Sequence, residues 1–158
     1  MRLLTVLGLV ALGAGLFGIW SLPPFRAMRA HNARLARIEQ ELLRLPLPEG
    51  TERRGVYSRV GLLSGGGNHC DYLAAMTLQG DVERVLLGEF YRRHTVPSPD
   101  GYPLEIRIGA GGLAPAPEYN DTLLDDLWME AFEIEGQRVT VVYVVDEGLS
   151  TDGDPRCH

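Results

Sequence analysis

The sequence predicts an α+β protein in which a small antiparallel sheet with one packed helix follows an N-terminal transmembrane helix. Three observations lead to this prediction: an uncharged apolar run near the N-terminus, an amphipathic helical pattern directly after it, and short strand-like segments separated by Gly-rich and Pro-rich loops. We expect a transmembrane anchor at residues 1–24, an amphipathic stalk helix at 25–45 and a small α+β globular domain at 46–158, with the element order ββαβββ.

The anchor is the uncharged run from Leu3 to Leu22. As a helix, these residues would span about 30 Å, the thickness of the hydrocarbon core of a bilayer. Arg2 precedes the run as the basic start of a cleaved signal peptide would, but the run exceeds the usual apolar part of such a peptide and no small-residue cleavage pattern follows it. We interpret it as an uncleaved, single-pass signal anchor, with a cleaved signal peptide as the alternative.

Small residues recur within the anchor at spacings that place them on one face of a helix. They are Gly8, Ala11, Gly15 and Gly18. A face of this kind lets a second backbone approach closely, so the spacing predicts packing inside the lipid bilayer against membrane protein subunits or a second copy of the chain. The alternative is that Gly and Ala are simply frequent in transmembrane helices.

Apolar residues continue at spacings of three and four through the predicted stalk helix, and Pro46 ends the pattern. The stripe consists of Met28, His31, Leu35, Ile38, Leu42 and Leu45. It can pair two copies of the chain, lie on the globular domain or rest on a neighbouring subunit. His31 is interpreted as a tolerated polar position in the stripe rather than as a ligand.

The strands of the domain are expected at residues 55–63, 70–78, 104–108 and 137–145, with a further strand in the ambiguous segment 125–135. Segment 125–135 fits either a helix or the first arm of a hairpin, and we choose the hairpin. Residues 104–108 alternate, which indicates one solvated face, whereas 137–145 is apolar on both faces and indicates a central strand.

One helix is expected in the domain at residues 81–93, where Asp81 can cap its start. Its buried face is predicted from the apolar residues that recur at helical spacing. These are Val82, Val85, Leu86 and Phe90. The charged residues of the segment then lie on the solvated side.

The two cysteines, Cys70 and Cys157, are predicted to form a disulfide, because one follows a Gly-rich loop and the other lies in a tail that would otherwise fray. Each has a histidine beside it, His69 and His158. A metal-binding or thiol enzyme site formed by these two Cys-His pairs is therefore the alternative. Because the pairs lack the ligand spacing of zinc modules, we expect no metal ion, no cofactor and no catalytic residue.

The location of the domain depends on two conflicting signals. Arg residues between 26 and 37 outnumber those before the anchor, and the positive-inside rule then favours a cytoplasmic domain. A short basic N-terminus before the anchor favours export of the following domain, and a disulfide requires an oxidising compartment. We expect the domain on the extracytoplasmic side of the cell membrane.

Charge is unevenly distributed along the chain. Residues 1–99 carry 12 Arg and 8 acidic residues, whereas residues 100–158 carry 3 Arg and 13 acidic residues. Because this acidic half repels phosphates, we expect no nucleic-acid binding. The acidic pairs Asp125-Asp126 and Asp146-Glu147 are interpreted as solvated turns, since neither has the spacing of a calcium loop. All 15 basic residues are Arg, which indicates a bacterial genome.

Two consecutive helices suited to interaction, and the lack of a convincing catalytic set, favour a non-enzymatic function. We expect a membrane-anchored accessory or interaction subunit of a larger membrane assembly, which contacts its partners through the anchor and stalk helices. One alternative is an extracytoplasmic metal-binding or thiol enzyme domain centred on His69, Cys70, Cys157 and His158. Another is a stalked envelope domain that binds or senses a small ligand.

Overall fold

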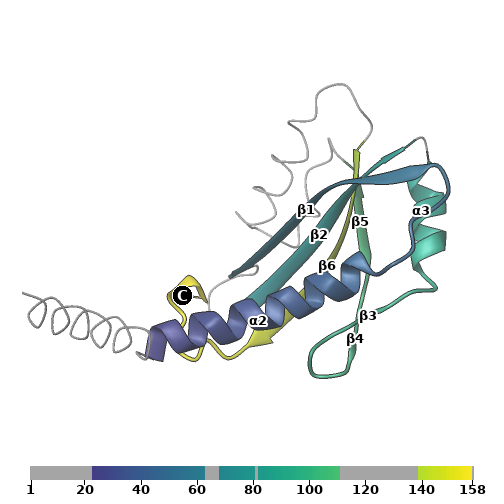
Figure 1. Cartoon of the computed structure of the whole chain (residues 1–158). Coiled ribbons are helices and arrows are strands. Elements are labelled where there is room, and N and C mark those ends of the chain that lie inside the picture. The colour runs from purple at the N-terminus through teal and green to yellow at the C-terminus, as the bar shows by residue number, and fades with distance from the viewer. Residues whose placement is uncertain (1–22, 63–67, 81, 111–138, 158) are drawn as a thin grey trace, which may run out of the picture.

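The computed structural model describes residues 23–62, 68–80, 82–110 and 139–157. Its elements are α2 (Pro23–Leu43), β1 (Thr51–Gly61), β2 (Cys70–Gly80), α3 (Arg84–Tyr91), β3 (Val96–Pro97), β4 (Pro103–Leu104), β5 (Arg107–Ala110), β6 (Val139–Leu149) and the short 3-10 helix η1 (Pro155–Cys157) (Figure 1). The predicted α+β class with a small antiparallel sheet is confirmed.

Four parts of the prediction lie outside the described residues. These are the anchor at 3–22 with its face of small residues, the predicted helix cap Asp81, the ambiguous segment 125–135, and His158. Within the four described ranges, no helix is both long enough and apolar enough to cross a membrane.

The main sheet has four antiparallel strands in the order β1-β2-β6-β5. β2 lies between β1 and β6, and its residues from Cys70 to Leu78 are all buried. β6 is the second inner strand, as its apolar sequence predicts. The two inner strands therefore carry the core of the domain.

The predicted single strand at 104–108 is wrong. Leu104 belongs to β4 and pairs with Val96 of β3 in a separate two-stranded sheet. Residues 107–110 form β5, which pairs with β6 in the main sheet. The chain passes from one sheet to the other at Glu105 and Ile106. The alternating apolar and polar residues of 104–108 therefore belong to two strands in different sheets.

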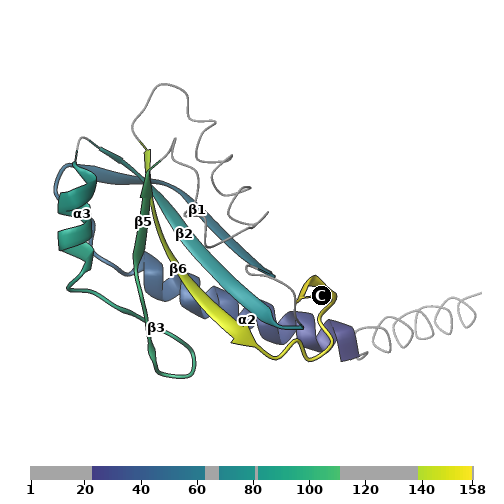
Figure 2. The same ribbon diagram turned by 180° about the vertical axis from the view of Figure 1, so that it is seen from behind.

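Helix α2 lies along one face of the main sheet, as Figures 1 and 2 show from opposite sides. Its buried residues are Ala27, His31, Leu35, Ile38 and Leu42. Ile38 and Leu42 are fully buried in one core with residues of β2 and β6, and each such side chain contributes about 1.5–3 kcal/mol. Of the three roles that the stripe allows, the structure shows packing on the globular domain. The helix expected as a stalk is therefore part of the core.

Helix α3 is shorter than predicted and buries a different face. Val85 and Leu86, predicted to be buried, are 69% and 54% exposed. Leu87 and Tyr91 are buried instead and join the core that α2 covers. Tyr91 is not part of the predicted face, and its hydroxyl donates a hydrogen bond to the carbonyl oxygen of Pro46 at 3.3 Å, which allows burial.

A bulge shapes β6 where it passes the start of β2. Cys70 pairs with Leu149 and Tyr72 with Asp146, so β6 contains one residue more than β2 between these pairs. Gly148 has a φ of +78° there, a conformation that favours glycine. The bulge directs the end of β6 into the tail that carries Cys157.

Candidate functional site

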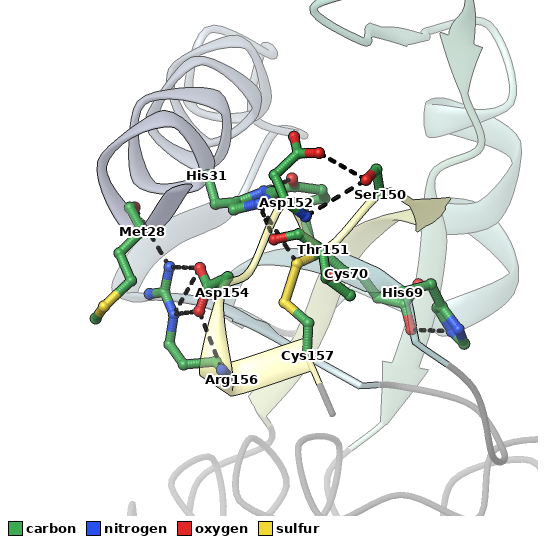
Figure 3. The surroundings of a disulfide bond; sticks show 12 residues. Met28, His31, His69, Cys70, Ser150, Thr151, Asp152, Asp154, Arg156 and Cys157 are labelled. Carbon is green, nitrogen blue, oxygen red and sulfur yellow. Dashed lines mark hydrogen bonds and ion pairs between the residues drawn. A yellow bond between two sulfur atoms is a disulfide. The ribbon is translucent and has the colours of Figure 1, made fainter. Parts of the chain in front are cut away.

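The predicted disulfide between Cys70 and Cys157 is present. It joins the first residue of β2 to η1 across 87 residues of sequence, with the two Cα atoms 4.8 Å apart. Both cysteines are fully buried, and Figure 3 shows the bond beneath helix α2. The bond occupies both sulfur atoms, so neither is a nucleophile or a metal ligand while it is intact.

His31 of α2 joins the helix to both β2 and the tail. Its Nδ1 is hydrogen bonded to the hydroxyl of Tyr72, and its Nε2 lies 3.0 Å from the carbonyl oxygen of Thr151. The same Nε2 lies 3.7 Å from the Sγ of Cys70. His31 is therefore more than a tolerated polar position in an apolar stripe, because both ring nitrogens have partners.

Asp154 and Arg156 form the second polar link between the tail and α2. The buried carboxylate of Asp154 accepts hydrogen bonds from the guanidinium of Arg156 at 2.6 and 2.9 Å. Arg156 also donates to the side chain of Asn32 at 2.7 Å and to the carbonyl oxygen of Met28. Burial raises the pKa of Asp154, but the hydrogen bonds from Arg156 outweigh this effect and hold it below its usual range.

Arg34 forms a third link between α2 and the sheet. Its guanidinium donates to Asp146 of β6 at 2.8 Å and to the exposed Asp100 at 2.7 Å. Tyr102 donates to the other carboxylate oxygen of Asp146. Burial lowers the pKa of Arg34, but its hydrogen bonds to Asp100 and Asp146 raise it by more.

The prediction that Asp146-Glu147 forms a solvated turn is wrong for the aspartate. Asp146 lies in β6 and its side chain is fully buried, where the positive charge of Arg34 compensates its own. The sequence offers no local signal for this pair, because the two residues are 112 positions apart. Asp125-Asp126 lies outside the described residues.

The candidate ligand set around the cysteines differs from the predicted one. The ligand atoms of His31, Cys70 and Asp154, all buried, lie within 4.8 Å of one another. His69 is instead paired with Asp71, at 3.1 Å between Nε2 and Oδ2. The structure therefore brings a histidine from helix α2 to Cys70, which adjacency in sequence could not reveal.

An open cleft of about 520 Å³ lies between α3 and the β4–β5 segment. Leu104, Ile106 and Ile108 supply apolar lining, and His94 and Arg92 supply polar groups. His94 is hydrogen bonded through Nδ1 to the carbonyl oxygen of Phe90 at 3.0 Å. The cleft was not predicted, because its walls come from elements whose packing the sequence pattern misplaced.

Comparison of the chain with protein-family models, with curated proteins and with solved structures finds no match. A function is therefore inferred from the arrangement of its own residues. Two features stand out among the described residues: the buried cluster where α2, β2 and the tail meet, and the open cleft beside α3.

Proposed function

We propose that this chain is a membrane-anchored, non-enzymatic interaction subunit whose globular domain lies on the extracytoplasmic side. The observation that carries the proposal is the position of the polar links along α2. His31 and Asn32 lie in the half of the helix that begins at Pro23, directly after the apolar run of the predicted anchor, and Arg34 lies at its middle. The other half of the helix is held as well, because Ser58 donates to Glu39 and Arg53 donates to the carbonyl oxygen of Leu43. An anchor at residues 3–22 would thus connect to a helix that is fastened to the domain along its length.

The partners of α2 in these polar links belong to three different elements of the chain, so the links support one another in holding the helix. Tyr72 belongs to β2, Asp146 to β6 and Arg156 to η1. The 21 residues of α2 extend about 32 Å from Pro23, and α3 lies at the opposite end of the molecule in both views (Figures 1 and 2). The arrangement suits a subunit that holds one end of its domain near the membrane and presents the other.

Packing of α2 on its own sheet leaves the anchor as the proposed route to a partner. The apolar stripe of α2 is occupied by the core, so contact with membrane protein subunits or a second copy rests on Gly8, Ala11, Gly15 and Gly18. The test compares the association of two variants, Gly15→Leu and Gly13→Leu. Gly13→Leu is the control, since Gly13 falls on the opposite face of a helix.

The full chain, purified in a mild detergent, tests this route. We expect the wild type and Gly13→Leu to keep the same partner, identified by mass spectrometry, or the same dimer, and Gly15→Leu to lose it. A wild-type chain that runs as a lone monomer would refute an interaction subunit. Equal association of both variants would refute contact through the face of small residues.

The disulfide supports the extracytoplasmic side, because disulfides persist in oxidising compartments. Reporter fusions at the C-terminus test this part of the proposal. Alkaline phosphatase fused after His158 is expected to be active, and a fluorescent reporter that matures only in the cytoplasm is expected to be dark. The reverse pattern would place the domain in the cytoplasm.

The cleft beside α3 favours a second candidate, a stalked domain that binds or senses a small ligand. Its volume of about 520 Å³ lies within the usual range for small-molecule sites. A side chain at Gly88 would enter open space in the lining, whereas Val85 is exposed on the same helix. Native mass spectrometry of the full chain should then detect a bound molecule in the wild type and Val85→Trp but not in Gly88→Trp. A wild type without any bound molecule would reject this candidate.

A further inference from the structure

We propose that the chain, once its disulfide is reduced, binds one Zn²⁺ ion through Cys70, Cys157, His31 and Asp154. Two thiolates, one imidazole and one carboxylate form a ligand set that suits tetrahedral zinc. The four residues come from β2, η1, α2 and the loop before η1, and Figure 3 shows them gathered around the sulfur atoms. The proposal is independent of the anchored-subunit function and concerns the reduced state of the chain.

The distance between the ligand atoms of His31 and Cys70 fits a zinc site. Nε2 of His31 lies 3.7 Å from Sγ of Cys70. A tetrahedral ion with Zn–S near 2.3 Å and Zn–N near 2.0–2.1 Å separates the same two atoms by about 3.6 Å. The carboxylate of Asp154 lies within 4.8 Å of both. Once the sulfur–sulfur bond breaks, the two sulfurs need to separate to about 3.8 Å, which side-chain rotation of Cys157 can supply.

The surroundings of His31 also suit a metal ligand. Histidine ligands usually hold a hydrogen bond at the ring nitrogen that faces away from the metal. Nδ1 of His31 has such a partner in the hydroxyl of Tyr72, which would accept the N–H and leave the lone pair of Nε2 for zinc. Zinc then replaces the carbonyl oxygen of Thr151 as the partner of Nε2.

The charge of the site is balanced by a residue already in place. Zn²⁺ with two thiolates and one carboxylate carries a single net negative charge. The guanidinium of Arg156, 2.6 Å from the carboxylate of Asp154, neutralises it. The carboxylate of Asp154 accepts hydrogen bonds from the backbone N–H of Arg156 and from two guanidinium nitrogens, of which Nε contacts both oxygens. A metal ion would replace the longest of these contacts, from Nε to Oδ2 at 3.2 Å, and leave each donor with a partner. Burial of the set is therefore compatible with its charge.

The change of state is a two-electron reduction followed by metal binding. A dithiol reductant attacks the disulfide, its own two sulfurs become oxidised to a disulfide, and Cys70 and Cys157 become thiols. Zinc binding then displaces the two thiol protons to solvent. The tail is thus fastened to β2 by the disulfide in an oxidising compartment and by zinc in a reducing one.

Cobalt(II), a spectroscopic substitute for zinc, tests the site in the full chain in detergent. After reduction with a phosphine and removal of metals, we expect one equivalent of Co²⁺ to give thiolate charge-transfer absorption together with the intense visible bands of a tetrahedral ion. Zn²⁺ should displace the cobalt. The oxidised chain is the negative control and should give neither absorption.

Histidine variants separate this site from the pairs adjacent in sequence. His31→Gln should weaken zinc affinity at least by the roughly 10–100-fold that loss of an outer hydrogen-bond partner costs. His69→Gln and His158→Gln should leave it unchanged, because the proposed ligand set contains neither residue, and His69 pairs with Asp71. Equal affinity in His31→Gln, or loss in His69→Gln, would overturn the proposal.

If the reduced chain loses its fold, circular dichroism still tests the proposal. Recovery of helix and sheet on addition of one equivalent of zinc supports the site, since zinc binding would then supply folding free energy. A reduced chain that stays unfolded with zinc, or that stays folded and yields no thiolate absorption with cobalt, contradicts it.

Discussion

Arg34 forms the ion pair that links α2 to the buried carboxylate of β6. Its side chain is 16% exposed and pairs with the fully buried carboxylate of Asp146. The guanidinium carbon also lies 5.4 Å from the ring centre of Tyr72, within the range of a cation–π contact. Loss of the cation would leave the buried carboxylate with only the hydroxyl of Tyr102 as a side-chain donor among the described residues.

Arg34→Ala is therefore expected to lower the free energy of unfolding by about 3–5 kcal/mol, the cost of removing one partner from a buried ion pair. The matched control is Arg44→Ala, whose side chain is 69% exposed and pairs with Glu41 at the surface. That change should cost only about 0–1 kcal/mol. Urea denaturation of the three chains measures the difference, and equal midpoints would contradict the assigned role of Arg34.

Tyr91 gives the domain a predicted alkaline limit. Burial raises its pKa to about 12, although Arg53 acts in the opposite direction. The unfolded chain releases this proton near pH 10, whereas the folded chain keeps it, so the contribution is fully present below pH 10 and is lost between pH 10 and 12. The loss is on the order of 2–3 kcal/mol.

Thermal unfolding at a series of pH values from 8 to 12 measures this effect. Tyr91→Phe should flatten the fall in stability above pH 10. Part of the fall should remain, because burial also raises the pKa of Tyr72 to about 12. The variant also lacks the hydrogen bond to Pro46, so its stability below pH 10 is the reference. An unchanged slope above pH 10 would show that the phenol of Tyr91 ionises freely in the folded domain.

At the scale of elements, hydrophobic spacing located α2 and the inner strands well. The stripe through His31, Leu35, Ile38 and Leu42 is the buried face of α2, because a regular apolar period and a terminating proline are local properties of the chain. The face of α3 could not be found in this way. Most residues of that short segment are apolar, so only the packing of Leu87 against the core distinguishes its inner side.

The corrected face of α3 yields a direct test. Leu87→Ala should lower the free energy of unfolding by about 2–5 kcal/mol, because Leu87 is 2% exposed and its loss leaves a cavity. Val85→Ala, on the 69% exposed side of the same helix, should change it by less than about 0.5 kcal/mol. Chemical denaturation compares the two, and the opposite ranking would restore the face predicted from the sequence.

For the molecule as a whole, the disulfide is expected to contribute strongly to the free energy of unfolding. Closing 87 residues of chain contributes about 4.6 kcal/mol by restricting the unfolded state, and removal of a disulfide from a small domain typically costs about 2–5 kcal/mol. The double change Cys70→Ser and Cys157→Ser should lower the melting temperature by the same amount as reduction of the wild type in the presence of a metal chelator. A melting temperature unaffected by either treatment would contradict this expectation.

Only the disulfide of the candidate site could be predicted from the sequence. The placement of Cys70 and Cys157 indicates a disulfide from the sequence alone, but His31 and Asp154 reach it through the packing of α2 and the course of the tail. Asp146 illustrates the same limit, because its partner Arg34 lies in a helix whose packing partner the sequence pattern left open. Contacts between distant segments depend on the topology of the sheet, which local periodicity does not encode.

The order of strands in the sheet also dictates when this domain can fold. β2 lies between β1, which precedes it directly, and β6, which begins at Val139. At the usual rates of protein synthesis, the ribosome needs roughly 3–14 s to extend the chain from Gly80 to Leu149. Throughout that interval β2 lacks one of its two neighbours, so the four-stranded sheet can be completed only after β6 has been synthesised.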